Sequence, residues 1–227
     1  MTDLLKLEEI LGYKFKNQNL LLQAVTHSSY ANEVLGDAAK DNERLEFLGD
    51  AVLDMVISNV LFKSEYDKAE GELTKLRASI VCERSLAEIS KARGFNDFLL
   101  LGKGEEQNGG RLRDSIIADC VEAIIGAIYT DSGFNAASTV VLKLFEDAIN
   151  NAEAGKLPRD SKTELQEKLQ SVGQHKIEYI LLSEEGPDHD KVFKFAVCVD
   201  GKQIGEGKGK SKKEAQTNAA EAALKGL

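Results

Sequence analysis

Acidic residues recur at intervals of three and four along residues 42–62. Glu43, Glu46, Asp50 and Asp54 fall on one face of a helix at these spacings, and the apolar residues fall on the other. Glu46–Asp50 and Asp50–Asp54 are like-charge pairs one turn apart, each of which costs about 0.2–0.5 kcal/mol. Neither Lys nor Arg lies between positions 45 and 62 to offset this repulsion. A cation held between the carboxylates would relieve it, whereas the ordinary alternative is a solvated charged face.

A second acidic helix is predicted around Asp119 and Glu122, which are three residues apart and lie opposite a row of isoleucines and valine. No basic residue occurs between Arg113 and Lys143. If the two helices pack side by side, their carboxylates form one cluster. Ligation by oxygen alone suits Mg²⁺ or Mn²⁺ and does not suit zinc. The clustered residues would be Glu43, Glu46, Asp50, Asp119 and Glu122.

The composition sets the class of protein that must position these acids. The chain has 227 residues, 42% of them hydrophobic, and its 29 Lys and Arg against 38 Asp and Glu give a net charge of −9. A length of this kind allows one large domain or two ordinary ones. The N-terminus is acidic where a signal peptide would be basic, and no apolar run approaches 18 residues. The three distant cysteines exclude a disulfide scaffold. We therefore expect a cytoplasmic globular protein without a membrane span.

The periodicity of apolar residues changes along the chain and indicates two modules. Residues 150–162 are small or polar and have no apolar period. Before them, helical spacing predicts helices over residues 4–11, 19–31, 42–62, 72–92, 115–130 and 134–151. After them, a helix at 161–171 precedes strands at 176–183, 192–199 and 203–207. The second and third strands are joined by a hairpin at Asp200-Gly201. A last helix begins at Ser211 with a capping box to Glu214. The expected fold class is a mainly α domain at 1–150, a linker at 151–160 and an α-β-β-β-α domain at 161–227.

Two other chemistries are disfavoured. The glycine-rich loop at 102–110 lacks the spacing of a phosphate-binding P-loop, so no nucleotide cofactor is expected. The three histidines, His27, His175 and His189, are not accompanied by a G-x-S-x-G nucleophile motif. His27 is interpreted as a structural residue, and we assign it no role.

Charge is distributed unevenly between the modules. Residues 1–158 hold 17 Lys and Arg against 26 Asp and Glu, a net of −9, whereas residues 159–227 hold 12 of each. Within residues 202–213, five lysines accompany the single acid Glu206. The start of a helix offers free N–H groups that suit phosphate. Lysines near it favour nucleic-acid binding, although an ordinary solvated lysine cluster is the alternative. These lysines are Lys208, Lys210, Lys212 and Lys213.

Several stretches resemble one family in the expected order. The nonapeptide Asn-Glu-Arg-Leu-Glu-Phe-Leu-Gly-Asp at 42–50 resembles the signature of the ribonuclease III family. Residues 101–106, 109–111 and 115–126 resemble that family's later segments, and the tail resembles a double-stranded-RNA-binding domain. The similarity covers nearly the whole chain.

The resemblance implies a metal-dependent endoribonuclease that cuts double-stranded RNA and leaves 5′-phosphate and 3′-hydroxyl ends. It implies Mg²⁺ as cofactor, with Mn²⁺ as a substitute, a homodimer, and processing of ribosomal and other RNA precursors. The family's metal-binding carboxylates fall on Glu43, Glu46, Asp50, Asp119 and Glu122, of which Asp50 and Glu122 would also be catalytic.

Three residues of the first module carry further expectations. Glu70 matches an acid tied to the neighbouring subunit's site, or is simply an acid favoured at a helix start. Phe47 would lie in the dimer interface, or in the core. Asp54 extends the acidic stripe but departs from the family pattern, and we do not expect it to be a ligand.

In the tail, the resemblance places 2′-hydroxyl contacts on Gln166, Gln170 and His189 and phosphate contacts on the four lysines. Two alternatives stay open, which are an inactive double-stranded-RNA-binding protein and a helical scaffold with incidental acids. No membrane partner is expected.

Overall fold

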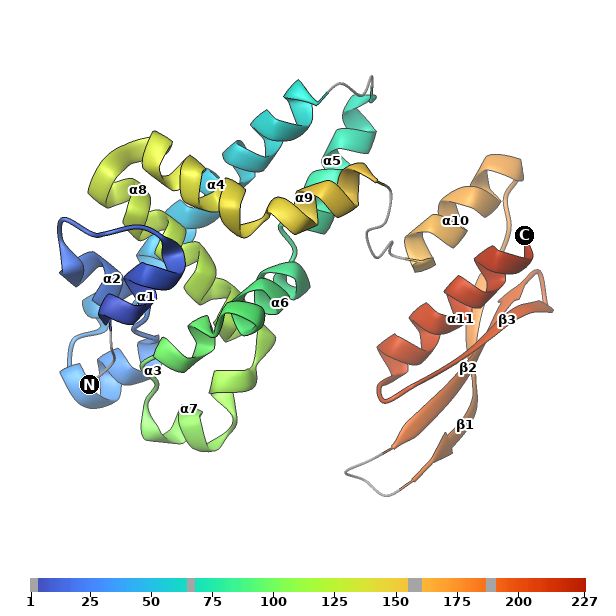
Figure 1. The fold of residues 1–227 in the computed structure, drawn as a ribbon. Coiled ribbons are helices and arrows are strands. Elements are labelled where there is room, and N and C mark those ends of the chain that lie inside the picture. The colour runs from blue at the N-terminus through green and yellow to red at the C-terminus, as the bar shows by residue number, and fades with distance from the viewer. Residues whose placement is uncertain (1–3, 65–67, 155–160, 187–190) are drawn as a thin grey trace. The chain divides into compact units, whose positions relative to one another are not determined.

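The computed structural model describes residues 4–64, 68–154, 161–186 and 191–227 (Figure 1). The chain divides into two compact units, Met1–Leu157 and Pro158–Leu227, each with its own hydrophobic core. The first unit is helical and the second has the order α-β-β-β-α, which confirms the fold class expected from the sequence. Helix α9 runs to Glu153, past the position where the sequence places the start of the linker. Among the described residues, no helix is long and apolar enough to span a membrane.

The N-terminal unit is built from helices of very different length. Its elements are α1 (Leu4–Leu11), α2 (Gln18–Ala24), α3 (Ser28–Tyr30), η1 (Ala31–Leu35), η2 (Ala38–Lys40), α4 (Glu43–Lys63), α5 (Glu70–Ile80), α6 (Glu83–Arg93), η3 (Phe95–Phe98), α7 (Lys103–Gln107), η4 (Gly110–Leu112), α8 (Asp114–Leu144) and α9 (Glu146–Glu153).

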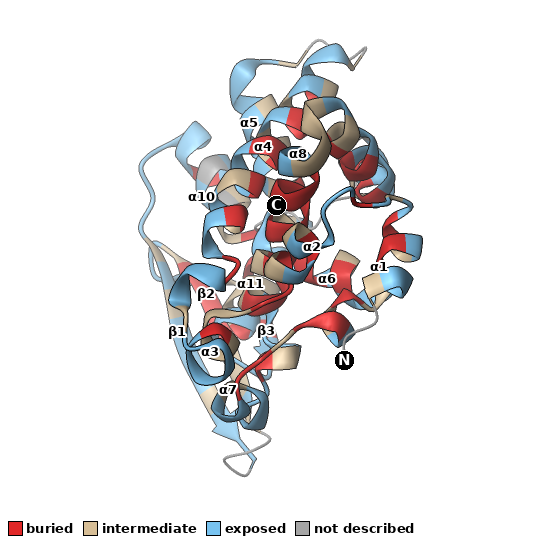
Figure 2. Ribbon diagram, turned by 90° about the vertical axis from the view of Figure 1, so that its left-hand side faces the viewer, coloured by how far each residue is buried: buried red, intermediate tan, exposed pale blue. Residues whose placement is uncertain are grey.

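Helices α4 and α8 pack against each other more extensively than any other pair in this unit, and α2, α5, α6 and α9 each contact one of them. Buried residues are drawn in red along both helices (Figure 2). On α4, the buried face includes Leu53, Val56 and Ile57, none of which is exposed to solvent. On α8, almost every residue from Ile116 to Ile128 is buried. Gly133 interrupts α8 with a left-handed φ of 79°, so the chain bends there before the helix resumes. The two long helices therefore supply both the core and the frame of the unit.

Two helices expected as single segments are divided. The segment 19–31 ends as a helix at Ala24, because Thr26 forms a parallel bridge with Leu100 and His27 caps the start of the separate helix α3. The segment 72–92 is split into α5 and α6 at Cys82, whose extended backbone (ψ 152°) starts a new helix. At residues 25–27, a tertiary contact overrides the helical spacing of apolar residues. At Cys82, no polar capping residue marks the break in the sequence.

The C-terminal unit consists of α10 (Ser161–Val172), β1 (Ile177–Glu185), β2 (Val192–Val199), β3 (Lys202–Gly209) and α11 (Lys212–Gly226). The strands pair antiparallel in the order β1-β2-β3. Both helices pack on one face of the sheet, with Leu165 and Leu169 of α10 meeting Val197 and Ala219. Asp200 and Gly201 adopt positive φ values of 50° and 82°, as the hairpin between β2 and β3 requires.

Strand β3 and helix α11 touch through residues that have almost no side chain. Gly205, Gly207 and Gly209 alternate along β3 and face a row of alanines on α11. A Cβ atom added at Gly207 would lie only 2.1 Å from the backbone nitrogen of Ala219. Helix α11 therefore rests directly on the backbone of β3, and larger residues would separate the two.

The start of α11 forms only half of the expected capping box. The Ser211 hydroxyl accepts a hydrogen bond from the Glu214 N–H at 3.1 Å. The Glu214 carboxylate accepts from the N–H of Lys210 at 2.7 Å, where a capping box would use the N–H of Ser211. The first turn of the helix is thus capped, with the return bond displaced by one residue.

Candidate metal centre and nucleic-acid interface

Two glycines allow α4 and α8 to cross in direct backbone contact. A Cβ atom added at Gly49 of α4 would lie 1.7 Å from the carbonyl oxygen of Glu122. One added at Gly126 of α8 would lie 2.1 Å from the carbonyl oxygen of Leu45. No side chain fits at either position, so the crossing depends on glycine. It brings the acidic turn of α4 against the acidic turn of α8.

Three carboxylates converge beside this crossing. Glu46 of α4 and Asp119 and Glu122 of α8 each offer an oxygen, and these oxygens all lie within 4.8 Å of one another. All three residues are half-buried. Closely spaced carboxylates that are partly removed from water are a suitable ligand set for a hard divalent cation.

Burial and mutual repulsion disfavour the ionised forms of these acids. Burial, followed by the charges of Asp50, Asp119 and Glu46, raises the pKa of Glu122 to about 8. Burial is also the main reason why the pKa values of Glu46 and Asp119 are raised, and the charge of His27 partly opposes the effect at Asp119. A bound divalent cation would offset this repulsion, so the residues present fit such an ion.

Glu43 and Asp50 act on the cluster from its edge. Both side chains are exposed on α4, and the charge of each raises the pKa of Glu46. Among the described residues, only the oxygens of Glu46, Asp119 and Glu122 form a group within 4.8 Å of one another, and neither Glu43 nor Asp50 belongs to it. The structure therefore brings three of the five expected ligands together and leaves two on the same helix beside them.

The remaining residues predicted for this unit lie outside the group of three. Asp54 forms an ion pair with Arg77 of α5 at 3.8 Å, which gives its carboxylate a partner within the protein. Glu70 is the first residue of α5, and its carboxylate accepts a hydrogen bond from the Thr74 hydroxyl at 3.1 Å. Phe47 is 81% exposed, so it is not a core residue of this chain.

Two residues for which the sequence predicted no role of their own fix the start of α4. The carbonyl of Asn42, a buried residue, accepts hydrogen bonds from the N–H groups of Leu45 and Glu46, both at 2.9 Å. The Asp41 carboxylate accepts from the Glu43 N–H at 3.2 Å. Side-chain capping makes Asp a preferred residue just before a helix, so the role of Asp41 could have been read from the sequence. The Asn42 side chain makes no capping bond. These bonds set the orientation of the first acidic turn.

The lysines expected to bind nucleic acid occupy two places. Lys212 and Lys213 begin α11, and Lys210 precedes its cap, Ser211. The Lys212 ammonium lies 5.8 Å from the centre of the Phe193 ring. Lys208 lies on the opposite face of the sheet, because it alternates with the glycines that contact α11. The structure thus separates Lys208 from the lysines at the helix start.

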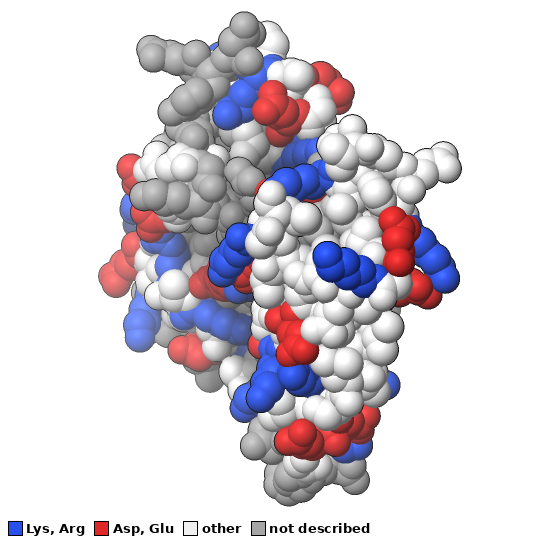
Figure 3. All heavy atoms as spheres, turned by 90° about the vertical axis from the view of Figure 1, so that its right-hand side faces the viewer, with Lys and Arg blue, Asp and Glu red and all other residues white. Residues whose placement is uncertain are grey.

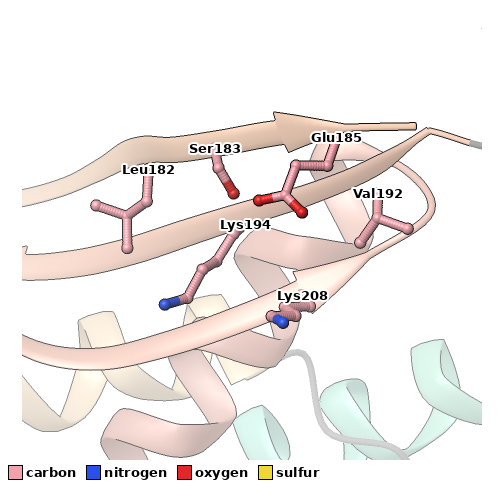
Figure 4. A pocket seen from close by; sticks show the side chains of 6 residues that line it. All are labelled: Leu182, Ser183, Glu185, Val192, Lys194 and Lys208. Atoms are coloured by element: carbon pink, nitrogen blue, oxygen red, sulfur yellow. The ribbon is translucent and has the colours of Figure 1, made fainter. Parts of the chain in front are cut away.

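Lys208 belongs to a pocket on the open face of the sheet (Figure 4). It stands directly across from Lys194 of β2, which in turn is paired in register with Ser183 of β1. Lys194 forms an ion pair with Glu206 at 2.6 Å. Basic and acidic side chains are similarly interspersed on the face of the molecule shown in Figure 3.

Gln166 and Gln170 are exposed on α10 and line a groove of about 240 Å³ between this helix and β1. The other residues that line it are Lys162, His175, Ile177 and Tyr179. His189, for which the sequence predicted a 2′-hydroxyl contact, lies outside the described residues.

Both units are similar to known families. A family model described as Ribonuclease-III-like matches residues 17–148, and a model described as double-stranded RNA binding motif matches residues 161–227. Ribonuclease 3 of Desulforamulus reducens is 49% identical over 222 residues, which are 98% of this chain and 90% of that protein. Ribonuclease 3 of Carboxydothermus hydrogenoformans is 47% identical, over 98% of this chain and 94% of that protein.

Solved structures agree for the helical unit. The nuclease domain of ribonuclease III from Campylobacter jejuni matches with a TM-score of 0.58 and 48% identity, over 63% of this chain and 96% of that chain. A second structure of the same domain gives a TM-score of 0.59 and 47% identity, over 65% and 96% of the two chains. The first of these is described with flexibility in a region involved in dimer formation. With relatives nearly half identical along almost its whole length, the chain belongs to the ribonuclease III family.

Proposed function

We propose that this protein is a metal-dependent endoribonuclease that hydrolyses phosphodiester bonds of double-stranded RNA and leaves 5′-phosphate and 3′-hydroxyl ends. The observation that carries the proposal is the meeting of Glu46, Asp119 and Glu122 at the glycine crossing, in a chain that also has a double-stranded-RNA-binding unit. Relatives named Ribonuclease 3, similar along nearly the whole chain, support the same activity.

In this proposal, Glu46, Asp119 and Glu122 hold Mg²⁺, for which Mn²⁺ substitutes, and Glu43 and Asp50 complete the site from the exposed side of α4. When bound, the ion supplies an activated water and stabilises charge on the leaving oxygen. Burial and the neighbouring carboxylates raise the pKa of Glu122 to about 8, so its protonated form is favoured and a cation competes with a proton at this carboxyl group. The resemblance to the ribonuclease III family further suggests that Asp50 and Glu122 act in catalysis as well as in ligation.

The C-terminal unit supplies attraction for the substrate. Lys212 and Lys213 combine their charge with the free N–H groups at the start of α11, an arrangement suited to phosphate. Gln166 and Gln170 are exposed on α10, and their amides suit 2′-hydroxyls in the shallow minor groove. We assign Lys210 to the same surface. The family resemblance adds a 2′-hydroxyl contact for His189, which lies outside the described residues. Lys208, on the other sheet face, would need a separate contact with RNA.

The proposal extends to assembly and location. Phe47, exposed on α4, is the residue through which we expect a second copy to pack, and Glu70 would then face the neighbouring subunit's site. Exposed aromatic residues of this size are typical of protein interfaces. The family resemblance further supports a cytoplasmic location and the processing of ribosomal and other RNA precursors.

The test measures cleavage and binding of one plain RNA duplex by the full chain, with and without Mg²⁺. We expect Mg²⁺-dependent cleavage by the wild type and a loss of about a hundred-fold or more in Glu122→Gln, since one ligand of a hard cation is removed. Duplex binding by Glu122→Gln should persist. Glu146→Gln is the matched control, because Glu146 is an exposed residue of α9. Binding without cleavage by the wild type would instead favour an inactive double-stranded-RNA-binding protein.

A further inference from the structure

The imidazole of His175 is held in a defined orientation by a residue far away in the sequence. His175 precedes β1, and its Nδ1 lies 2.7 Å from Oδ2 of Asp200 in the hairpin between β2 and β3. The other oxygen of Asp200 accepts a hydrogen bond from the Lys176 N–H at 2.9 Å, and the Asp200 N–H donates to the Lys176 carbonyl at 2.9 Å. These three bonds join the segment before β1 to the hairpin, and the first of them orients the ring.

This contact determines which ring nitrogen faces outward. An ionised carboxylate only accepts hydrogen bonds, so the nitrogen next to Asp200 carries a proton. Within the described residues, Nε2 of His175 makes no hydrogen bond, and 31% of the side chain is exposed. An imidazole fixed through one nitrogen with the other left open is a common arrangement where a histidine binds a ligand.

His175 is one of the residues that line a polar groove. His175 lines it together with Lys162, Gln166 and Gln170, which follow one another at intervals of four and share one face of α10. The Lys162 ammonium lies 4.6 Å from the centre of the Tyr179 ring and donates to the Gln216 side chain at 2.9 Å. The groove thus combines an oriented imidazole, two amides, a cation and an aromatic ring.

These groups match the chemistry of a ribose edge. Amide groups and an imidazole can each pair with a hydroxyl, and the 2′-hydroxyl of RNA both donates and accepts. The minor groove of an RNA duplex is wide and shallow, so a side chain at the rim of a protein groove can reach it. We propose that His175, positioned by Asp200, binds a 2′-hydroxyl of duplex RNA through Nε2 and extends the surface formed by Gln166 and Gln170. This inference rests on the proposed function.

The experiment compares two duplexes of one sequence in a gel-shift assay with the full chain and without Mg²⁺. One duplex is RNA, and the other carries 2′-fluoro groups in place of the 2′-hydroxyls. We expect His175→Ala to weaken RNA binding about five-fold, the size of one hydrogen bond, and to leave binding of the fluoro duplex at its wild-type level. Gln174→Ala is the matched control, because Gln174 is exposed in the same segment and does not line the groove.

A second variant separates recognition from packing. His175→Phe keeps an aromatic ring but has no ring nitrogen, so it should lose RNA affinity to the same extent, with thermal unfolding confirming that it is folded. Equal losses on both duplexes, or wild-type RNA binding by either variant, would overturn the assignment. Failure of the wild-type chain to bind duplex RNA would instead refute the proposed function, so the two failures are distinguishable.

Discussion

Gly49→Ala tests whether the backbone contact between α4 and α8 governs both stability and the acid cluster. The added methyl group would lie 1.7 Å from the carbonyl oxygen of Glu122, and 2.9 Å from the backbone nitrogen of Gly126. Ordinary contact distances exceed 3.4 Å. Since the obstructing atoms are backbone, no side-chain rotation relieves the clash. Helix α4 must therefore move away from α8 by more than about 1 Å to restore an ordinary contact distance.

Two opposing terms set the expected size of the effect. Replacing glycine by alanine within a helix favours folding by roughly 0.5–1 kcal/mol. Forcing an extra group into a packed interface costs about 1–3 kcal/mol, and a clash between backbones belongs at the upper end of that range. The expected net loss is about 2 kcal/mol, or about 4–8 °C in Tm for a unit of this size. Moving Glu46 away from Glu122 by about 1 Å should also slow cleavage about a hundred-fold.

The assay is thermal unfolding together with the cleavage rate on one RNA duplex. Gly71→Ala is the matched control, since Gly71 is also helical but has open space around it, and it should be slightly more stable than the wild type. If Gly49→Ala unfolded at or above the wild-type temperature and cleaved RNA normally, the reasoning from the crossing would be refuted.

Three further results are expected. In the metal-free protein, Glu122 has a pKa of about 8 in the folded state and 4.5 in the unfolded chain, so the folded state binds its proton more tightly. The free energy of unfolding should therefore fall as pH rises from 4.5 to about 8. Tm measured over this pH range in the presence of a chelator should show the decrease, and Glu122→Gln should reduce it. Lys212→Ala and Lys213→Ala should weaken binding of all duplex sequences alike and reduce its salt dependence, and a sequence-selective loss in gel shifts would contradict phosphate contacts. A fragment of residues 1–157 should unfold cooperatively and keep its helical circular dichroism, since each unit has its own core; a disordered fragment would contradict this independence.

Spacing along one helix predicted which acids share a face, because the period of an α-helix is fixed. It could not predict which of them meet across two helices. The selection of Glu46, Asp119 and Glu122 depends on the register at Gly49 and Gly126, which only tertiary packing sets. Both glycines can be seen in the sequence. A glycine within a helix can reflect close packing, a functional need or a nearby helix end, so the crossing could not be predicted from them.

The placement of Lys208 could have been predicted. Glycine at every second position from 205 to 209 indicates one face of a strand, and Lys208 alternates with it. The prediction placed Lys208 with Lys210, Lys212 and Lys213 because they are close in sequence, and it did not take this alternation into account. His175 is different, because its partner Asp200 is 25 residues away and no local pattern links them.

The contact between β3 and α11 limits how this protein can change over evolutionary time. The atoms that face its glycines include backbone atoms of α11, so a larger side chain introduced on β3 meets groups that no change of rotamer can move. Substitutions at the solvent-facing positions of α11 meet no such obstacle, so we expect variation among relatives there and not at the contact with β3. Affinity for substrates could then change through exposed residues such as Lys213, while the packing distance between α11 and β3 stays the same.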